Sequence, residues 1–285
     1  GGMIVIATAL IKDSYEGKAM SKVLSITQAF GLIAPMVAPI LGAIILKVAD
    51  WKMSFIVLAI LTGVTLLGAF LLQDTLPVQK RTQGSTIQSI LGLGRVAKNL
   101  SFTSLLLVGA FVSAPYMAYL ALASYIYIEG FGVSETTFSI YFAINSAAAI
   151  LGPVIYMKFG AGSVKKVINV GIIVSIISAG LILTVGNAGP IIFLLSYVIY
   201  SIVTSYFRPM ISDLLLSATN TDVGAASSVM SFAFTIVGSL GMVVGTLGWS
   251  SYIGGLAMTM FIFIAITLLV WIFLLKAKSI KFDWK

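Results

Sequence analysis

The chain alternates long apolar runs with short polar segments, and eight of the runs are long enough to cross a membrane as a helix. A span takes roughly 20 consecutive apolar residues. The runs lack the every-second-residue alternation of membrane-barrel strands. A ninth run, residues 1–11, has about half the length that a span needs. The predicted helices cover residues 23–46, 53–73, 102–126, 137–157, 167–187, 190–212, 224–247 and 252–275.

Composition identifies these runs as parts of a membrane protein. Of the 285 residues, 59% are hydrophobic and 9% are charged, whereas a soluble domain carries about 25% charged residues. The chain contains neither Cys nor His. This excludes disulfides, thiolate chemistry and the most common metal ligand and acid–base group. We therefore predict an all-α integral membrane bundle that has no catalytic residues and no metal site and is not an enzyme.

The positive charges gather on one side of the predicted membrane. Threading the chain through its spans places 15 of the 17 Lys and Arg residues on one side, and only Lys47 and Lys52 on the other. The side rich in Lys and Arg is the cytoplasmic one, so the C-terminus is predicted to be cytoplasmic. The net charge of +8 is then an orientation signal and a contact for anionic lipid headgroups, and no binding to nucleic acid is expected.

One long polar interval divides the chain unequally. We predict a cytoplasmic loop (74–101) between the end of a first domain (1–73) and a second domain (102–285) of six spans. The later part of this loop, residues 85–100, is either a basic amphipathic helix on the membrane surface or a solvated linker. The segments GKAMSKVLSITQAFG (17–31) and GAASSVMSFAFTIVG (224–238) are similar to each other, as in transporters built from two repeated halves.

The same comparison of the two halves gives an interpretation of the half-length run at the start of the chain. If the first domain also has six helices, residues 1–11 are the end of its fourth helix, and about 8.5 of 12 membrane helices are present. We then expect three and a half further helices to precede Gly1. The alternative is the apolar region of a signal peptide, which follows a basic stretch; here Lys12 comes after the apolar run instead.

Several segments carry a family resemblance. GGMIVIATALIKDSY (1–15) is similar to the end of a fourth transporter helix, although Thr8 stands where the family often has Arg. DWKMSF (50–55) and DTLP (74–77) are similar to the start and exit of a sixth helix, and FRPMISDLLLSATNTDVGAASSVMSF (207–232) to the link between a tenth and an eleventh. This order resembles the major facilitator superfamily, and within it the drug:proton antiporters of the bicyclomycin/chloramphenicol-resistance type. The resemblance implies a major-facilitator-type helical bundle.

The stretch FGLIAPMVAPILGAII (30–45) contains Gly31, Pro35, Pro39 and Gly42 in one apolar helix. Gly31, Pro35 and Pro39 are four residues apart and share a helical face. Each proline bends the helix and frees a carbonyl, and glycine lets a neighbouring backbone approach. The plainer interpretation is a simple kink, because Pro and Gly are frequent in membrane helices. The resemblance implies the antiporter motif, a hinge and seal between the two halves.

Candidate residues for a substrate cavity are the polar and aromatic residues inside the spans. Such a cavity combines apolar and aromatic side chains with a few polar groups, and buried Asn or Gln faces the bundle interior. Tyr116, Tyr119 and Tyr141 are alternatively anchors at the outer headgroups, and Tyr125 and Tyr127 are assigned to that aromatic belt. An aromatic cavity without acids favours neutral or weakly charged substrates. The candidates are Gln28, Tyr116, Tyr119, Tyr141, Asn145, Tyr197 and Tyr200.

Four charged residues lie at predicted cytoplasmic ends of helices and are candidates for a cytoplasmic gate: Lys12, Asp13, Arg208 and Asp213. The structural alternative for Asp13 and Asp213 is that these carboxylates pair with Lys or Arg. No acid lies deep in any of the eight full spans. The resemblance places coupling acids in the first helix of the family, so no coupling residue is named in this chain.

The resemblance implies a secondary active multidrug efflux transporter that exports small hydrophobic or amphipathic compounds in exchange for protons, with antibiotic resistance as the consequence. It implies a monomer in a bacterial inner membrane, whose partners are a small-molecule substrate and the lipid bilayer. The proton gradient, and no cofactor, supplies the energy. The alternatives are an importer of a small metabolite and a truncated chain that does not transport. A membrane-embedded enzyme would need a convergent Ser, Asp or Lys cluster, and the polar residues are scattered.

Overall fold

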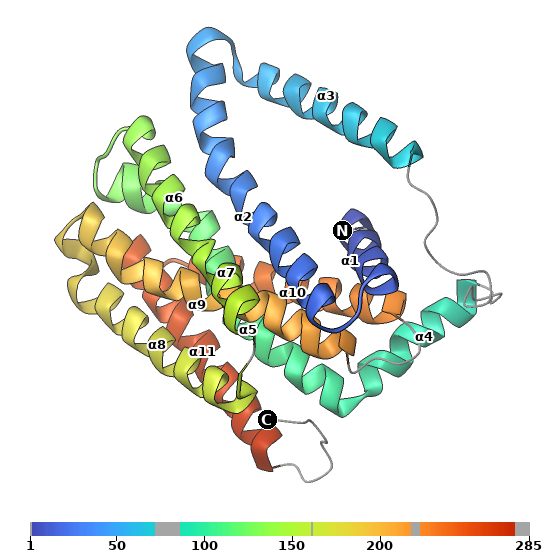
Figure 1. Cartoon of the computed structure of the whole chain (residues 1–285). Helices are drawn as coiled ribbons and strands as arrows, with labels where there is room; N and C mark the ends of the chain where they lie inside the picture. The colour runs from blue at the N-terminus through green and yellow to red at the C-terminus, as the bar shows by residue number, and fades with distance from the viewer. Residues whose placement is uncertain (1, 72–85, 161, 218–222, 277–285) are drawn as a thin grey trace.

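The computed structural model describes residues 2–71, 86–160, 162–217 and 223–276, without the side chains of some residues in the first, second and fourth helices. Within this part the chain forms eleven α-helices (Figure 1). A π-helix (Tyr125–Gly130) extends α5. The helices are α1 (Gly2–Ser14), α2 (Gly17–Val48), α3 (Trp51–Phe70), α4 (Thr86–Lys98), α5 (Leu100–Ser124), α6 (Glu135–Ala149), α7 (Leu151–Phe159), α8 (Val164–Val185), α9 (Pro190–Ser217), α10 (Val223–Gly245) and α11 (Tyr252–Lys276).

Seven stretches of the described chain are long and apolar enough to cross a membrane, and they confirm seven of the eight predicted spans. The eighth prediction, 23–46, lies within α2, which runs through both prolines as one helix of 32 residues. The seven stretches are Trp51–Phe70, Leu100–Gly130, Glu135–Phe159, Val164–Ala188, Pro190–Ser217, Val223–Gly245 and Tyr252–Lys276.

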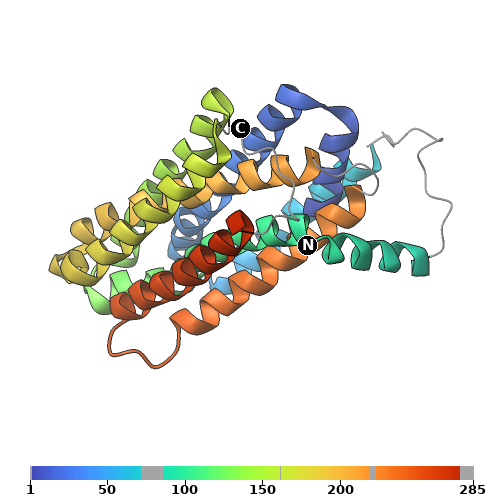
Figure 2. The same cartoon turned by 90° about the horizontal axis from the view of Figure 1, so that it is seen from below.

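The helices after residue 100 form a closely packed bundle against which the first two helices lie. Helix α5 packs against α9, α10 and α11, and α8 packs between α9 and α11, so these helices lie side by side when the molecule is seen from below (Figure 2). Helix α2 crosses this bundle against α6, α7 and α9, and α1 lies against α10 (Figure 1). Helix α3 runs away from the bundle, and none of its residues is buried.

The loop between the two predicted domains contains a helix. Residues 86–98 form α4, which packs against α5 and α10, so a solvated linker is excluded for this part. The side chain of Asn99 then accepts a hydrogen bond from the backbone N–H of Phe102 at 3.2 Å and caps the start of α5. The first part of the loop, residues 74–85, lies outside the described residues.

Three glycines let α10 pack closely against α5, and at Gly241 the contact is with the backbone of α5. A Cβ built on Gly241 would lie 2.3 Å from the Ala114 carbonyl oxygen, and one built on Gly245 would lie 3.0 Å from the Cβ of Ala118. A Cβ built on Gly238 would lie 2.9 Å from the Met117 side chain. Small residues let membrane helices approach in this way, because dispersion contacts rather than hydrophobic burial hold such helices together.

The predicted span 137–157 is interrupted at Ile150, between α6 and α7. Pro153 has no backbone N–H to donate to the carbonyl four residues earlier. That carbonyl, of Ala149, instead accepts a hydrogen bond from the Ser205 hydroxyl of α9 at 2.6 Å. Ser205 reaches it because residue 152 is a glycine, where a Cβ would lie 2.2 Å from the Ser205 oxygen. The hydrogen bond from Ser205 therefore links the span to α9 at the point where the span is interrupted.

A second proline lies inside α5, which continues through it as one helix, and α9 also donates hydrogen bonds close to this proline. Pro115 is inside the helix, and the carbonyl of Val112, about one turn earlier, accepts hydrogen bonds from the hydroxyl of Tyr200 and, at 3.4 Å, from that of Thr204. Both donors come from α9. The Val112 carbonyl lies next to the one that Pro115 leaves without an N–H donor, which is four residues before the proline. Helix α9 therefore donates hydrogen bonds both beside the proline of α5 and at the break between α6 and α7.

We expect Tyr200→Phe to destabilise the protein by about 1 kcal/mol, because a buried carbonyl loses its main donor. Tyr119→Phe is the matched control: Tyr119 is equally buried, and its hydroxyl has no hydrogen-bond partner among the described residues. The measurement is the temperature at which half of the detergent-solubilised protein is lost from the monomeric elution peak. Equal loss from the two substitutions would contradict a special role for the Tyr200 hydroxyl.

Candidate functional site

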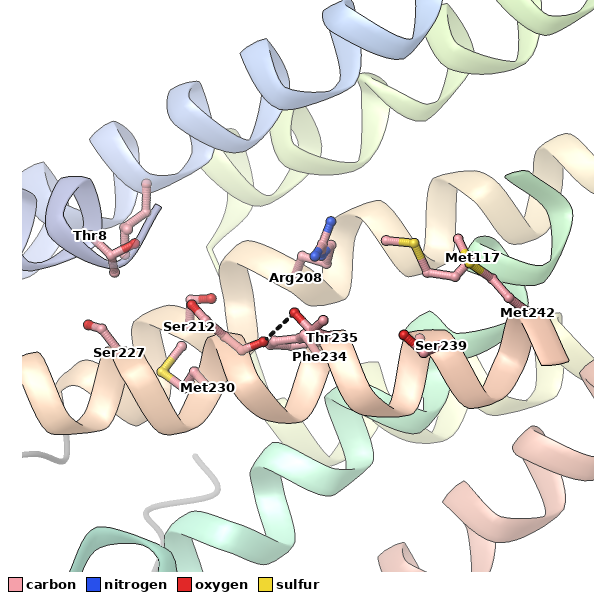
Figure 3. Close-up of a pocket in the computed structure, with 13 residues that line it drawn as sticks. Thr8, Met117, Arg208, Ser212, Ser227, Met230, Phe234, Thr235, Ser239 and Met242 are labelled. Carbon is pink, nitrogen blue, oxygen red and sulfur yellow. Dashed lines mark hydrogen bonds between the residues drawn. The ribbon is translucent and has the colours of Figure 1, made fainter. Parts of the chain in front are cut away.

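A cavity of about 420 Å³ lies where the first two helices meet the bundle (Figure 3). Its wall is formed by α1, α2, α5, α9 and α10. Most of the lining side chains are hydroxyls and methionines, and one is a cation. The lining residues are Thr8, Leu24, Met117, Arg208, Ser212, Ser227, Met230, Ser231, Phe234, Thr235, Gly238, Ser239 and Met242.

Arg208 was predicted at a gate, and the structure places it in this cavity. Its side chain is half-buried on α9, and its guanidinium carbon lies 5.3 Å from the centroid of the Phe234 ring. In Figure 3 it lies near the centre of the labelled residues, with Ser212 and Ser227 toward Thr8 on one side. A guanidinium over an aromatic ring is held by a cation–π interaction and keeps its hydrogen-bond donors available.

Asp213 joins three helices at the end of the bundle where α2 begins and α7 ends. One of its carboxylate oxygens accepts hydrogen bonds from the Ser21 hydroxyl of α2 and the Tyr156 hydroxyl of α7, both at 2.5 Å. The other accepts from Ser217, within α9, at 3.4 Å. Sequence reasoning proposed a Lys or Arg partner as the structural alternative, and the partners found in the described chain are hydroxyls instead. We call this group, Ser21, Tyr156 and Asp213, the carboxylate clasp.

The burial of α2 changes along its length in keeping with the clasp. Met20, Leu24 and Ser25, one to two turns from its start, are buried against the bundle. Farther along, Phe30 and Val48 are strongly exposed. Lys18 of α2 and Lys158 of α7 lie at the same end of these helices as the clasp.

The candidate tyrosines pack together inside the bundle instead of lining the cavity. The Tyr119 and Tyr197 rings are stacked with their centroids 4.0 Å apart, and Tyr200 is 5.8 Å from Tyr197. Tyr116 is also buried. Burial of Tyr116 and Tyr119 removes the headgroup-anchor alternative for these two. Tyr127 was assigned to the outer aromatic belt, and that assignment is wrong, because its side chain is fully buried, whereas the side chain of Tyr125 is exposed.

The remaining cavity candidates have separate environments. Asn145 is buried, and its carbonyl oxygen accepts a hydrogen bond from the Ser201 hydroxyl at 2.8 Å, so it links α6 to α9. Tyr141 is half-buried and stacks on Tyr127 at 5.3 Å. The side chain of Gln28 lies outside the described part of the structure. A role of these residues in contacting substrate stays a prediction.

The proposed hinge and seal lies in α2. The side chains of Pro35 and Pro39 lie outside the described part. At Gly31 and Gly42 no described atom lies within 4 Å of an added Cβ, so the close backbone approach that we expected there is found at Gly241 and Gly152 instead. The function of the motif as a hinge stays a prediction.

The other two gate candidates lie at the end of α1. Asp13 is exposed and Lys12 is half-buried, and their role in a gate also stays a prediction. Within the described residues no group of Asp and Glu side chains comes together closely enough to hold a metal ion.

Comparison with known proteins agrees with this architecture. The sequence profile described as Major Facilitator Superfamily matches residues 1–242. The chain belongs to the Major Facilitator Superfamily. Members of this superfamily are transporters and not enzymes, which confirms the expected class of protein, its multi-pass membrane character and its all-α fold.

Among major facilitator relatives, this chain is 36% identical over 160 residues to the uncharacterized MFS-type transporter YdgK of Bacillus subtilis (strain 168), covering 55% of this chain and 40% of that protein. It is 28% identical over 171 residues to the multidrug transporter MdfA of Edwardsiella piscicida, covering 58% and 41% of the two chains. The chain thus spans about two fifths of the length of these relatives.

A solved major facilitator structure shares the arrangement of the helices. The crystal structure of the human organic anion transporter MFSD10 (TETRAN) superposes with a TM-score of 0.76 at 16% identity, covering 95% of this chain and 67% of that one. At this identity the similarity shows the fold alone.

The residues that sequence reasoning missed are mainly the hydroxyls and methionines of α10. One signal did point to them: the similar segments 17–31 and 224–238 together supply seven of the thirteen residues that line the cavity. Six of the seven belong to 224–238, and Leu24 alone belongs to 17–31. The similarity did not indicate which side chains of the two segments line the cavity.

Proposed function

We propose that this protein is the transporting core of a multidrug efflux antiporter of the bicyclomycin/chloramphenicol-resistance type, which exports small amphipathic compounds in exchange for protons. The observation that carries the proposal is the cavity between the first two helices and the bundle, which is lined mainly by α10 and also by residues of α1, α2, α5 and α9. Transporters of this kind bind substrate between repeated halves and expose it alternately to each side. The similarity to proteins named multidrug transporter MdfA supports the same substrate class.

The arrangement of domains and the orientation belong to this proposal. Residues 1–73 belong to one domain and residues 102–285 form a second domain of six helices, with the loop 74–101 on the cytoplasmic side. The protein works as a monomer in a bacterial inner membrane, with its C-terminus in the cytoplasm. The proton gradient drives it without a cofactor. The carboxylate clasp then lies at the cytoplasmic end, where it holds α2 against α7 and α9.

The test is drug accumulation in a bacterium that lacks its main efflux pumps and expresses the protein from its gene. We expect cells to accumulate several-fold less of at least one drug in a panel of anionic, neutral and cationic amphipathic compounds than cells with an empty vector, and a protonophore to abolish the difference. Higher accumulation would support the alternative of an importer. Unchanged accumulation of every compound in a broad drug panel would contradict an exporter.

A further inference from the structure

The cavity contains a positive charge that the described protein does not neutralise. Arg208 lies within the span Pro190–Ser217, and no carboxylate among the described residues interacts with its guanidinium. Asp213 lies five residues further along α9, and its carboxylate accepts hydrogen bonds from the hydroxyls of Ser21, Tyr156 and Ser217. An ionised side chain in a membrane-spanning helix that faces the protein interior is costly unless a partner compensates it. The Phe234 ring stabilises one face of the guanidinium, and the N–H donors at the edge of the guanidinium remain available to a ligand.

A second polar group in the same wall lacks a partner. The Ser227 side chain is 2% exposed, and its hydroxyl makes no hydrogen bond with any described residue, yet Ser227 lines the cavity (Figure 3). A buried hydroxyl without a partner carries an energetic penalty that a bound ligand removes. Ser212 lies one turn from Arg208 on the same face of α9 and also lines the cavity.

We propose that this cavity binds organic anions, in which a carboxylate, phosphonate or sulfonate group is held by the Arg208 guanidinium, while the hydroxyls of Ser212 and Ser227, toward Thr8 (Figure 3), are available to other polar groups of the compound. Guanidinium donors match the two oxygens of such a group. The apolar body of the compound lies against Phe234 and the three methionines, whose flexible side chains adapt to different shapes. This inference rests on the proposed function and specifies its substrates. It replaces the expectation of neutral or weakly charged substrates that an aromatic cavity had favoured.

The test compares two probes of the same shape that differ in charge, naphthalene-2-carboxylate and naphthalene-2-carboxamide. Binding to the purified protein in phosphatidylcholine nanodiscs is measured by equilibrium dialysis at neutral pH. We expect the carboxylate to bind at least ten-fold more tightly than the amide. Arg208→Gln is expected to abolish that preference, because it weakens binding of the carboxylate far more than binding of the amide, and Arg208→Lys is expected to retain part of the preference.

Equal affinities of the wild-type protein for the two probes would overturn the proposal, as would undetectable binding of the carboxylate at millimolar concentration. A third result would also overturn the proposal: Arg208→Gln lowers the affinities for both probes equally, and Arg208→Lys keeps the wild-type affinity for both. Arg208 would then act on the shape of the cavity.

A lipid headgroup offers the same anionic chemistry, and a second series of nanodiscs distinguishes the two sources. If phosphatidylglycerol in the disc competes with the carboxylate probe, an anionic lipid occupies the site in the membrane; if the affinity is unchanged, a soluble compound does. Both results support an anion site at Arg208. Because binding is measured without transport, efflux of neutral drugs combined with no preference for the carboxylate would overturn this inference alone. The reverse combination would overturn the efflux proposal alone.

Discussion

Replacing Gly241 by alanine is expected to lower the apparent melting temperature of the protein by roughly 5 °C or more. The added methyl group would lie 2.3 Å from the Ala114 carbonyl oxygen and 2.8 Å from its carbon. Both are backbone atoms of α5, so they cannot rotate out of the way. Helices α5 and α10 must therefore separate, and overpacking of this kind costs about 1–3 kcal/mol.

The matched control for Gly241→Ala is Gly180→Ala. Gly180 is also inside a membrane helix, α8, but no described atom lies within 4 Å of a Cβ built there. Alanine is the better helix former by about 1 kcal/mol, so this variant is expected to be as stable as the original chain or slightly more stable. Both are compared by heating in detergent and following the monomeric elution peak. A Gly241→Ala protein as stable as Gly180→Ala would show that α5 and α10 do not need backbone contact.

Replacing Asp213 by alanine is expected to release α2 from the bundle at the end that carries the carboxylate clasp. The change removes the acceptor of two hydrogen bonds, from Ser21 and from Tyr156. Hydrogen bonds to a charged group each stabilise by about 1.5–3 kcal/mol. Even a net loss of about 2 kcal/mol changes the ratio of joined to separated conformations about 30-fold.

The absence of cysteine from the chain makes this separation directly measurable. Spin labels on cysteines introduced at Lys18 and Lys158, which are exposed on α2 and α7, report the distance across the clasp. We expect Asp213→Ala to shift the distance distribution toward longer values, and Asp213→Asn, which keeps an acceptor oxygen, to shift it less. Ser217→Ala removes only a bond within α9 and is expected to leave the distribution unchanged. An unchanged distribution in Asp213→Ala would contradict the clasp.

The spans could be predicted from the sequence because each is a continuous apolar run whose length is fixed by the membrane. The internal breaks could not be predicted. Residues 137–157 form one apolar run with Pro153 near its end, and the position of the break depends on Ser205, 56 residues away from Ala149. Similarly, Pro115 and the prolines of α2 look alike in sequence, but only at Pro115 does the described structure place two α9 hydroxyls on a nearby carbonyl.

The candidate site could be predicted in part. The sequence indicates which charged residues are unusual, but it does not indicate which side chains they contact. Charge at a helix end identified Arg208 and Asp213 as unusual. Their partners, a ring on α10 and hydroxyls 192 and 57 residues distant, depend on how the helices cross. Serine in membrane helices usually bonds to its own helix, as Ser113 does, so Ser227 gave no local signal. The tyrosines were recognised as interior groups, but whether they line a cavity or stack on one another is decided by packing.

The glycine contacts between α5 and α10 also limit which substitutions can accumulate in this sequence during evolution. Ala114 meets Gly241, and Ala118 meets Gly245, through backbone or Cβ atoms, so neither partner can enlarge while the helices keep their spacing. Gly238 meets the long flexible side chain of Met117, so a larger residue there can be accepted after the methionine shortens. Among homologous chains, the first two pairs are therefore expected to vary little, and residues 117 and 238 to vary together.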